Sequence, residues 1–124
     1  MALKIDKLKQ SWVKKISNAK GLDVFHDLVK VPELCQDKDF VMFAVNQYGN
    51  SLKYASDELR NDREVVLTAV AQEGWALQYA SDQLRNDREI VLAAVKQNPE
   101  ALQYASNELL VDEEIVRTAA MNQE

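Results

Sequence analysis

One histidine, His26, and one cysteine, Cys35, are the residues of this 124-residue chain that could carry nucleophilic catalysis. Such chemistry needs a nucleophile and a base that converge in space. His26 lies in an apolar segment, and Cys35 occupies a repeated position that elsewhere holds Arg60, Arg85 and Leu110. A position that tolerates such different side chains is not typical of a nucleophile. The sequence therefore predicts no catalytic residue and no enzyme.

Two acidic clusters, Asp37-Lys38-Asp39 and Asp112-Glu113-Glu114, could hold a cation. A calcium loop alternates its ligands, places a glycine at its sixth position and ends on a glutamate, and the residues after Asp37 do not follow that pattern. Helix capping explains these acids better. The sequence also has no zinc-binding spacing, no phosphate-binding glycine loop and no dinucleotide fingerprint. It predicts no metal and no cofactor.

The net charge of −5 is unevenly distributed. Residues 1–30 contain seven Lys and three Asp, a balance of +4, so residues 31–124 carry the remaining −9. An acidic body repels a phosphate backbone, and nucleic-acid binding would depend on the basic leader alone, whose lysines are typical of a solvated helix face. We therefore expect no nucleic-acid partner.

The sequence contains no run of about 18 apolar residues, so neither a membrane span nor the core of a signal peptide is predicted. A single cysteine excludes an intramolecular disulfide and fits a reducing compartment. These features favour the cytosol and no membrane partner.

A tandem repeat organises most of the chain. Asp37, Asp62, Asp87 and Asp112 are spaced by 25 residues, and the segment 54–70 recurs as 79–95 with three substitutions. We call the residues at equivalent positions of the units a column. The sequence predicts one domain, 1–124, composed of an N-terminal helical cap (1–36), three repeats (37–61, 62–86 and 87–111) and a terminal half repeat (112–124).

Each unit is expected to form a pair of helices. In the second unit Asp62 is a preferred N-cap, and Val65, Val66, Ala69 and Val70 form an apolar stripe at helical spacing. Gly49 and Gly74 stand where the first helix would end in a left-handed residue, and Asn98-Pro99 replaces that signal in the third unit. A shorter helix follows, and Ser81 caps one further turn. One such hairpin cannot cover its own apolar face, so the units must stack into an all-α, solenoid-like array of short helical hairpins.

Both ends of this array need an explanation. Ile5, Leu8, Trp12, Ile16 and Ala19 form an apolar stripe, Gly21 ends that helix, and a second apolar segment, 22–31, reaches Pro32. We expect this helix pair to cap the first unit. At the other end no second helix follows, so Ile115, Ala119 and Met121 are predicted to lie exposed and to mediate self-association, with a homodimer as the simplest outcome.

Three aromatic residues are candidate partner contacts, because the other units hold small or polar residues in the same columns. Trp75 replaces Asn50 and Glu100, Tyr48 replaces Glu73 and Asn98, and Phe43 replaces Thr68, Ala93 and Thr118. Local packing is the alternative. Four arginines, Arg60, Arg63, Arg85 and Arg88, lie along one edge and could bind carboxylates of a partner, although pairing within the chain, with Glu64, Glu89 and the helix caps, is favoured.

The recurring "NDREVVLTAV" and "ALQYAS" segments resemble a bacterial domain-of-unknown-function family of tandem helical repeats, over about residues 32–120. The final unit departs from the pattern at Arg117 and Ala120. Within this family, a chain of this size is similar to a small type IV-secreted effector that inhibits ubiquitin deamidase and transglutaminase enzymes. The resemblance implies a protein partner that is a ubiquitin-modifying effector enzyme, a role in virulence, and a location in the bacterial cytoplasm and, after secretion, the host cytosol.

Two functional hypotheses follow. The first is a non-catalytic protein–protein interaction module that inhibits another protein. The second is a structural protein that homodimerises through an apolar end of the array.

Overall fold

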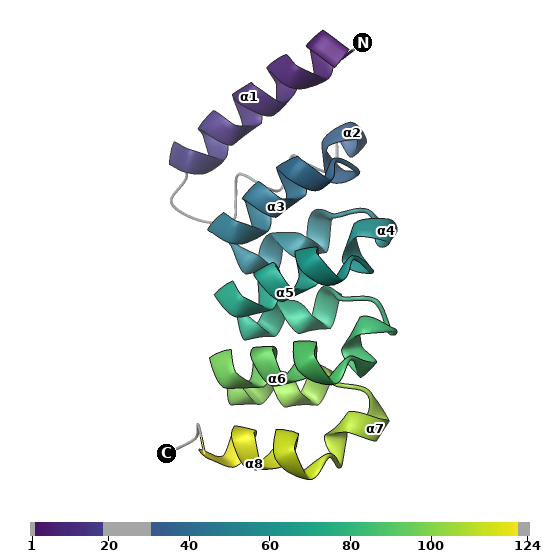
Figure 1. The fold of residues 1–124 in the computed structure, drawn as a ribbon. Coiled ribbons are helices and arrows are strands. Elements are labelled where there is room, and N and C mark those ends of the chain that lie inside the picture. Colours follow the sequence, from purple (N-terminus) through teal and green to yellow (C-terminus); the bar gives the residue numbers. More distant parts are fainter. Residues whose placement is uncertain (1, 19–30, 122–124) are drawn as a thin grey trace.

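The computed structural model describes the backbone of residues 2–18 and 31–121 and, from Lys7 onward, the side chains of these residues. Every regular element in these ranges is a helix, which confirms the predicted all-α fold. The helices stack one above another from the N-terminal helix α1 (Ala2–Asn18) to the C-terminal helix α8 (Glu113–Met121), so the two ends of the chain lie at opposite ends of an elongated molecule (Figure 1).

Four longer helices occupy equivalent positions in successive units. They are α3 (Lys38–Gln47), α5 (Arg63–Gln72), α6 (Arg88–Gln97) and α8. The predicted N-caps are confirmed, since the side chain of Asp62 accepts hydrogen bonds from the backbone N–H groups of Glu64 and Val65 at 3.0 and 3.2 Å. An Asp at the N-cap accepts hydrogen bonds from backbone N–H groups of the first turn, which have no partner within the helix. It also adds negative charge at the positive end of the helix dipole. The period of 25 residues is therefore a period of helix starts.

The second helix of each unit is a 3₁₀-helix, where the sequence had suggested a short helix without specifying its type. These elements are η2 (Gly49–Tyr54), η3 (Gly74–Tyr79) and η5 (Pro99–Tyr104). Asn98 caps η5 by accepting from the backbone N–H of Glu100, with Pro99 at the first helical position, as predicted.

A single short helical turn completes each unit. In the three successive units this turn is α4 (Asp57–Arg60), η4 (Leu84–Asn86) and α7 (Asn107–Leu110). Ser81 Oγ accepts from the backbone N–H of Leu84 at 3.2 Å, and Leu84 is buried, as the sequence indicated. The serine hydroxyl satisfies a backbone donor that the tight bend would otherwise leave without a partner.

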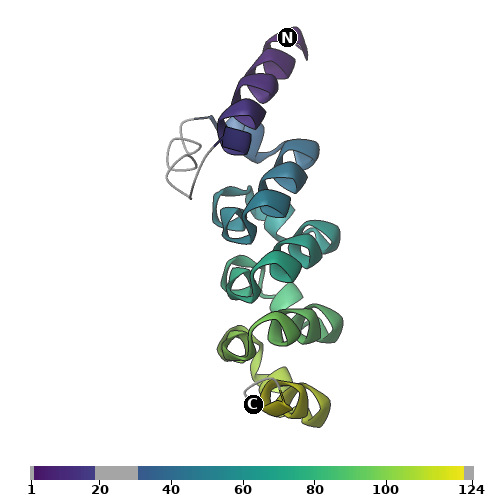
Figure 2. The same ribbon diagram turned by 90° about the vertical axis from the view of Figure 1, so that its left-hand side faces the viewer.

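The longer helices stack into one column of helices and the 3₁₀-helices into a second. Figure 2 shows these two stacks side by side. Each longer helix packs against the longer helix of the next unit, and each 3₁₀-helix against the next 3₁₀-helix. The core runs between the columns; in α5, for example, Val65, Val66, Ala69 and Val70 are all buried. Each unit thus completes the core of its neighbour, which is how a hairpin too small to fold alone becomes stable.

The two described glycines of the repeat correct a prediction. No described glycine has a positive φ, so Gly49 and Gly74 do not end a helix in a left-handed conformation. Each is the first residue of a 3₁₀-helix, and a Cβ on Gly74 would lie 2.5 Å from the carbonyl oxygen of Ala94 in the next unit. A Cβ on Gly49 would overlap Ala69 O in the same way. Close approach between units requires glycine here, and the backbone angle does not.

Helix α1 covers the first unit. Trp12 and Ile16 are buried against Phe40 and Ala44 of α3 and against Leu34 of the short helix α2 (Pro32–Cys35). The expected capping role of the first leader helix is therefore confirmed. Ala19, Gly21 and nearly all of the second apolar segment, 22–31, lie outside the described residues, as does His26.

The opposite end corrects another prediction. Ile115 and Ala119 are buried, with 0% and 5% of their surfaces exposed, because the apolar stripe of α8 packs onto α6 and η5. They therefore belong to the core and not to an exposed end. Met121 is exposed, as predicted.

Candidate interaction surfaces

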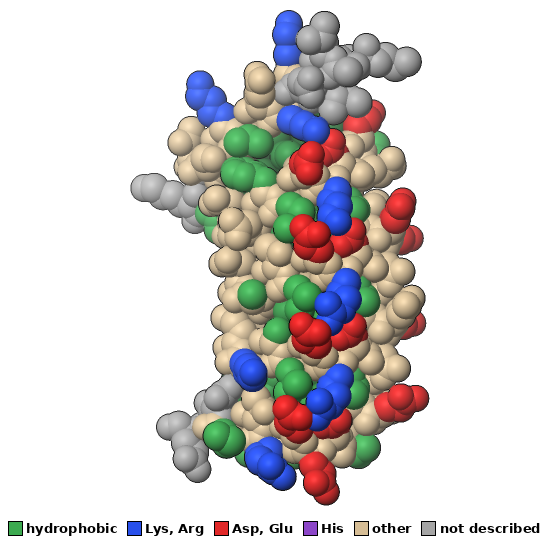
Figure 3. Space-filling view, viewed as in Figure 1, with side chains coloured by type: hydrophobic (Ala, Val, Ile, Leu, Met, Phe, Trp, Pro, Cys, Tyr) green, Lys and Arg blue, Asp and Glu red, His purple; other side chains and the backbone are tan. Residues whose placement is uncertain are grey.

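A ladder of ion pairs crosses every junction between units. Lys38 Nζ lies 3.0 Å from Asp62 Oδ2, and Arg63 Nε lies 3.0 Å from Asp87 Oδ2. The same cations reach the glutamate of the next helix as well: Lys38 bonds Glu64 and Arg63 bonds Glu89. Figure 3 shows these blue and red side chains in a row along the column of longer helices, beside a line of hydrophobic side chains.

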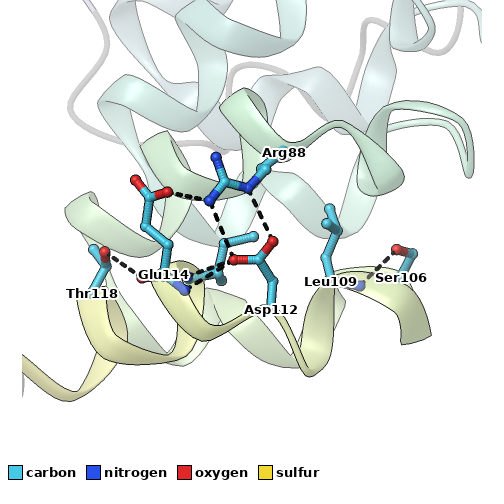
Figure 4. Close-up of polar contacts among 7 residues, drawn as sticks. Arg88, Ser106, Leu109, Asp112, Glu114 and Thr118 are labelled. Carbon is cyan, nitrogen blue, oxygen red and sulfur yellow. Dashed lines mark hydrogen bonds and ion pairs between the residues drawn. The ribbon is translucent and has the colours of Figure 1, made fainter.

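The ladder has one further rung at each end of the array, and the first of them joins unlike elements. At the N-terminal end Lys9 of α1 takes the place of a repeat cation and lies 2.6 Å from Asp37. At the C-terminal end Arg88 donates from Nε to Asp112 Oδ2 at 3.0 Å and also bonds Glu114 (Figure 4). Each rung between repeats therefore connects a cation at the start of one longer helix to the N-cap of the next, whereas the cation of the first rung, Lys9, lies in the middle of α1.

The aspartates of the ladder do two things at once. One oxygen of Asp87 accepts from the backbone N–H of Ile90, while the other accepts from Arg63. Partial burial favours the protonated form, but these hydrogen bonds outweigh it and hold the pKa of Asp87 below its usual range. Asp37, Asp62 and Asp112 show the same direction, and in Asp112 the bond from Arg88 is the largest cause.

The four candidate arginines are therefore engaged within the chain, as the sequence favoured. Arg63 and Arg88 belong to the ladder, while Arg60 and Arg85 each bond an aspartate three residues earlier, Asp57 and Asp82. Arg60 and Arg85 also line two open grooves of equivalent position, one unit apart. A partner that used these guanidinium groups would have to compete with the pairs already formed.

Serine and asparagine side chains add a second kind of junction contact. Ser81 Oγ donates to Asn61 Oδ1 at 2.5 Å, and Ser106 Oγ donates to Asn86 Oδ1 at 2.5 Å. The backbone N–H of Ser81 also donates to the carbonyl oxygen of Arg60 at 3.0 Å. These bonds repeat at each internal junction, so they fix the register of one unit on the next.

Half-buried aromatic side chains follow the column of 3₁₀-helices. We call Tyr54, Trp75, Tyr79 and Tyr104 the aromatic row. Trp75 contacts Tyr104 of the next unit edge to face, with ring centroids 5.7 Å apart and an interplanar angle of 66°. Lys53 Nζ lies 5.7 Å from the centre of the Tyr54 ring. Trp75 thus packs locally, as its alternative interpretation held, and still leaves part of its surface exposed.

The other two candidate aromatic residues lie elsewhere. Phe43 and Tyr48 both pack against the buried cluster of α1, α2 and α3 and are partly exposed. The first unit has helix α1 as its upper neighbour instead of another repeat, which explains why these two columns hold large side chains only there. The structure does not bring Trp75, Tyr48 and Phe43 into one site, and their roles as partner contacts stay predictions.

Cys35 is half-buried, and burial together with the nearby charge of Glu33 raises the pKa of its thiol. A raised pKa keeps the thiol protonated and weakly nucleophilic. Across residues 2–18 and 31–121, no three His, Cys, Asp or Glu side chains are grouped as metal ligands would be. None of the helices described is both long and apolar enough to cross a bilayer.

The described C-terminal end exposes apolar side chains that sequence reasoning missed. Val111 is 78% and Val116 is 42% exposed, and Met121, which the sequence did predict to be exposed, is at 67%. The signal was present in the repeat register, because Val116 shares a column with Val66 and Val91, which are fully buried where another unit follows.

Comparison with known families decides the classification. The model of a domain of unknown function, DUF4116, matches four overlapping segments, residues 26–60, 37–85, 62–110 and 87–123. The chain belongs to the DUF4116 family. No curated protein and no solved structure matches it.

The DUF4116 segments follow the structural period. Three of them begin at residues 37, 62 and 87, which are the N-cap aspartates of α3, α5 and α6. Successive matches are offset by one repeat, and the match to 62–110 spans two longer helices, each followed by its 3₁₀-helix and short turn. Family membership confirms the predicted repeat family and supplies no binding or catalytic residue.

Proposed function

We propose that this DUF4116 protein is a non-catalytic protein-binding module that inhibits an enzyme by covering part of its surface. The observation that carries the proposal is the aromatic row on the column of 3₁₀-helices. Trp and Tyr are enriched in binding hot spots because they bury a large area with few rotatable bonds and offer a polar group as well. The stacked units hold these rings on a rigid support, which lowers the entropic cost of binding.

The aromatic row lies apart from the ion-pair ladder, whose cations stand at the starts of the longer helices. Beside the indole of Trp75, the neutral amide of Gln78 donates to the carbonyl oxygen of Trp75 at 3.1 Å. A partly apolar patch with amides at its edge suits a protein surface better than a small charged ligand.

The resemblance to small secreted effectors adds the class of partner. We propose a bacterial effector enzyme that deamidates ubiquitin or cross-links it as a transglutaminase. An inhibitor of such an enzyme needs no catalytic group of its own, in keeping with a chain whose single cysteine is kept protonated by burial. With that partner class goes a proposed location in the bacterial cytoplasm and, after secretion, in the host cytosol, which the resemblance supports.

Trp75→Asn tests this function. Asn is the residue of the first unit at this column, Asn50, so the change is compatible with the fold. We expect it to weaken binding to a purified ubiquitin deamidase at least about tenfold, as for a hot-spot aromatic residue. Calorimetry measures the affinity, and the rate of ubiquitin deamidation measures inhibition.

Gln47→Ala is the control, because Gln47 is an exposed residue of α3, on the column of longer helices. Its affinity should stay within about twofold of the unchanged protein. Equal losses of affinity in both variants would show that the aromatic row is not the contact surface. A protein that leaves every tested deamidase and transglutaminase fully active would refute the partner class.

A second candidate function is assembly of the protein through its C-terminal end. The exposure of Val111, Val116 and Met121 at the C-terminal end of the array favours it, because exposed apolar side chains that lie close together are typical of a contact site.

A further inference from the structure

The last unit departs from the repeat at the positions that hold junctions together. Glu113 stands in the column of Lys38, Arg63 and Arg88, the cations of the ladder. Val111 stands in the column of Asn61 and Asn86, whose amide oxygens accept the serine hydroxyl of the next unit.

These changes make the end unsuited to another unit of the same kind. A following unit would bring its N-cap aspartate and the next glutamate against this position, as Asp87 and Glu89 meet Arg63. Opposite Glu113 the same carboxylates would repel. Val111 has no side-chain oxygen to accept the serine hydroxyl, so that hydrogen bond would also be lost.

The exposed side of α8 has a stripe of two apolar residues, one acidic residue and one basic residue. Glu113, Val116, Arg117 and Ala120 follow each other at helical spacing, so they lie along one side of α8. All four are exposed. Within the described part of the chain, neither Glu113 nor Arg117 makes an ion pair. Across a two-fold axis, this stripe would face the same stripe of a second copy in the opposite direction. Side chains at one end of each stripe would then meet those at the other end of its partner.

We propose that the end of one copy receives the same end of a second copy, with the two α8 helices antiparallel and crossing at Val116. In that arrangement the position opposite Glu113 is two residues from Arg117 of the second copy, a shift of about 3 Å along the axis. Two equivalent ion pairs then flank a contact made by Val116 and the small Ala120. Met121 and Val111 extend the apolar surface on either side.

This inference rests on the second candidate function and gives it a geometry. One helix and one short loop from each copy make a contact smaller than the standard of about 800 Å² per partner. The dissociation constant of the dimer is therefore expected in the micromolar to millimolar range.

A charge exchange tests the arrangement. Sedimentation velocity of the full chain between about 10 and 500 µM should show the unchanged protein shifting from monomer to dimer. Glu113→Arg leaves two positive residues on each stripe, and Arg117→Glu leaves two negative ones, so each variant alone should stay monomeric over that range. An equimolar mixture of the two should associate again, because each stripe now meets one of opposite charge.

Ala71→Lys is the control for surface charge in general. Ala71 is exposed on α5, away from the C-terminal end, and the next unit holds Lys96 in the same column, so this change should leave dimerisation unchanged. A monomeric unchanged protein at about 500 µM would overturn both the geometry and the second candidate function. A dimer that persists in both single variants would overturn the geometry alone, and dimer formation would then depend on another surface.

Discussion

At the scale of single residues, near-identical units separate what the fold requires from what it tolerates. Glycine is a clear case. Gly74 has an ordinary backbone conformation, but its missing side chain leaves room for the carbonyl oxygen of Ala94. The reason for glycine therefore lies in the neighbouring unit, and no pattern within one unit could have revealed it.

Gly74→Ala should reverse the usual effect of this substitution. Where space allows, replacing glycine by alanine stabilises a protein by about 0.4–1 kcal/mol through the unfolded state. Here the added Cβ would lie 2.5 Å from Ala94 O, so we expect a loss of about 1–3 kcal/mol, as for other overpacked sites. Urea unfolding measures it.

Gln103→Ala, a change at an exposed residue of η5, is the control and should alter stability by less than about 0.5 kcal/mol. An increase in stability for Gly74→Ala would show that the units can move apart without cost, against the close contact described above.

Residue types predicted some contacts and not others. Asp62 and Ser81 were correctly predicted as caps, because a cap and its helix are adjacent in the sequence. Glu89 and the N-cap aspartates were predicted as partners of the arginines, but which arginine reaches which carboxylate was not, since the bonds of Arg63 to Asp87 and Glu89 span a junction and depend on how far one helix is displaced along the next.

At the scale of elements, each unit has one strongly patterned helix and two weakly patterned turns. Helical periods of 3.6 and 3.0 residues differ by about 20° per residue, and six residues hold too few apolar side chains to separate them, so the sequence could not identify η3 as a 3₁₀-helix. Helix α1 was predictable because its stripe extends over several turns. The candidate contact Phe43 was harder to interpret, because a helix outside the repeat covers its cluster.

Trp12→Ala should loosen α1 without unfolding the array. Trp12 is 6% exposed and contributes to the cluster between α1 and α3, so its truncation should cost about 3 kcal/mol locally. Amide hydrogen exchange in α1 should then become about a hundredfold faster. Amides of α6 should change little, because each unit contacts only its neighbours.

Lys15→Ala is the comparison for this experiment. It removes a cation 4.8 Å from the centre of the Trp12 ring but keeps the ring itself, so protection of α1 should fall far less. Equal acceleration of exchange in α1 and α6 would mean that the array unfolds as one unit, contrary to this expectation.

At the scale of the whole molecule, the ion-pair ladder links stability to pH. The folded pKa values of Asp37, Asp62, Asp87 and Asp112 are lowered. The unfolded chain therefore binds more protons than the folded protein near and below an aspartate pKa of about 3.9. The stability that these carboxylates contribute is complete above that pH and is lost as pH falls through the lower folded values.

The urea midpoint should therefore stay level from about pH 8 to 6 and fall below about pH 5. Asp87→Asn keeps an oxygen that can accept from Ile90 N–H but loses the charge that pairs with Arg63. It should cost less than about 1 kcal/mol at pH 7 and make the acid-induced fall shallower. An identical pH profile in the variant would show that the acid sensitivity comes from other carboxylates.

The equivalence of the internal junctions has a consequence for how such a chain can change its length. The contacts of Lys38 with Asp62 and Glu64, and of Arg63 with Asp87 and Glu89, have the same chemistry. Unequal crossing-over between the gene segments that encode 62–86 and 87–111 would therefore add or remove 25 codons without creating a new kind of junction. Such an event would change the length of the aromatic row in whole steps, while both ends of the molecule kept their own chemistry.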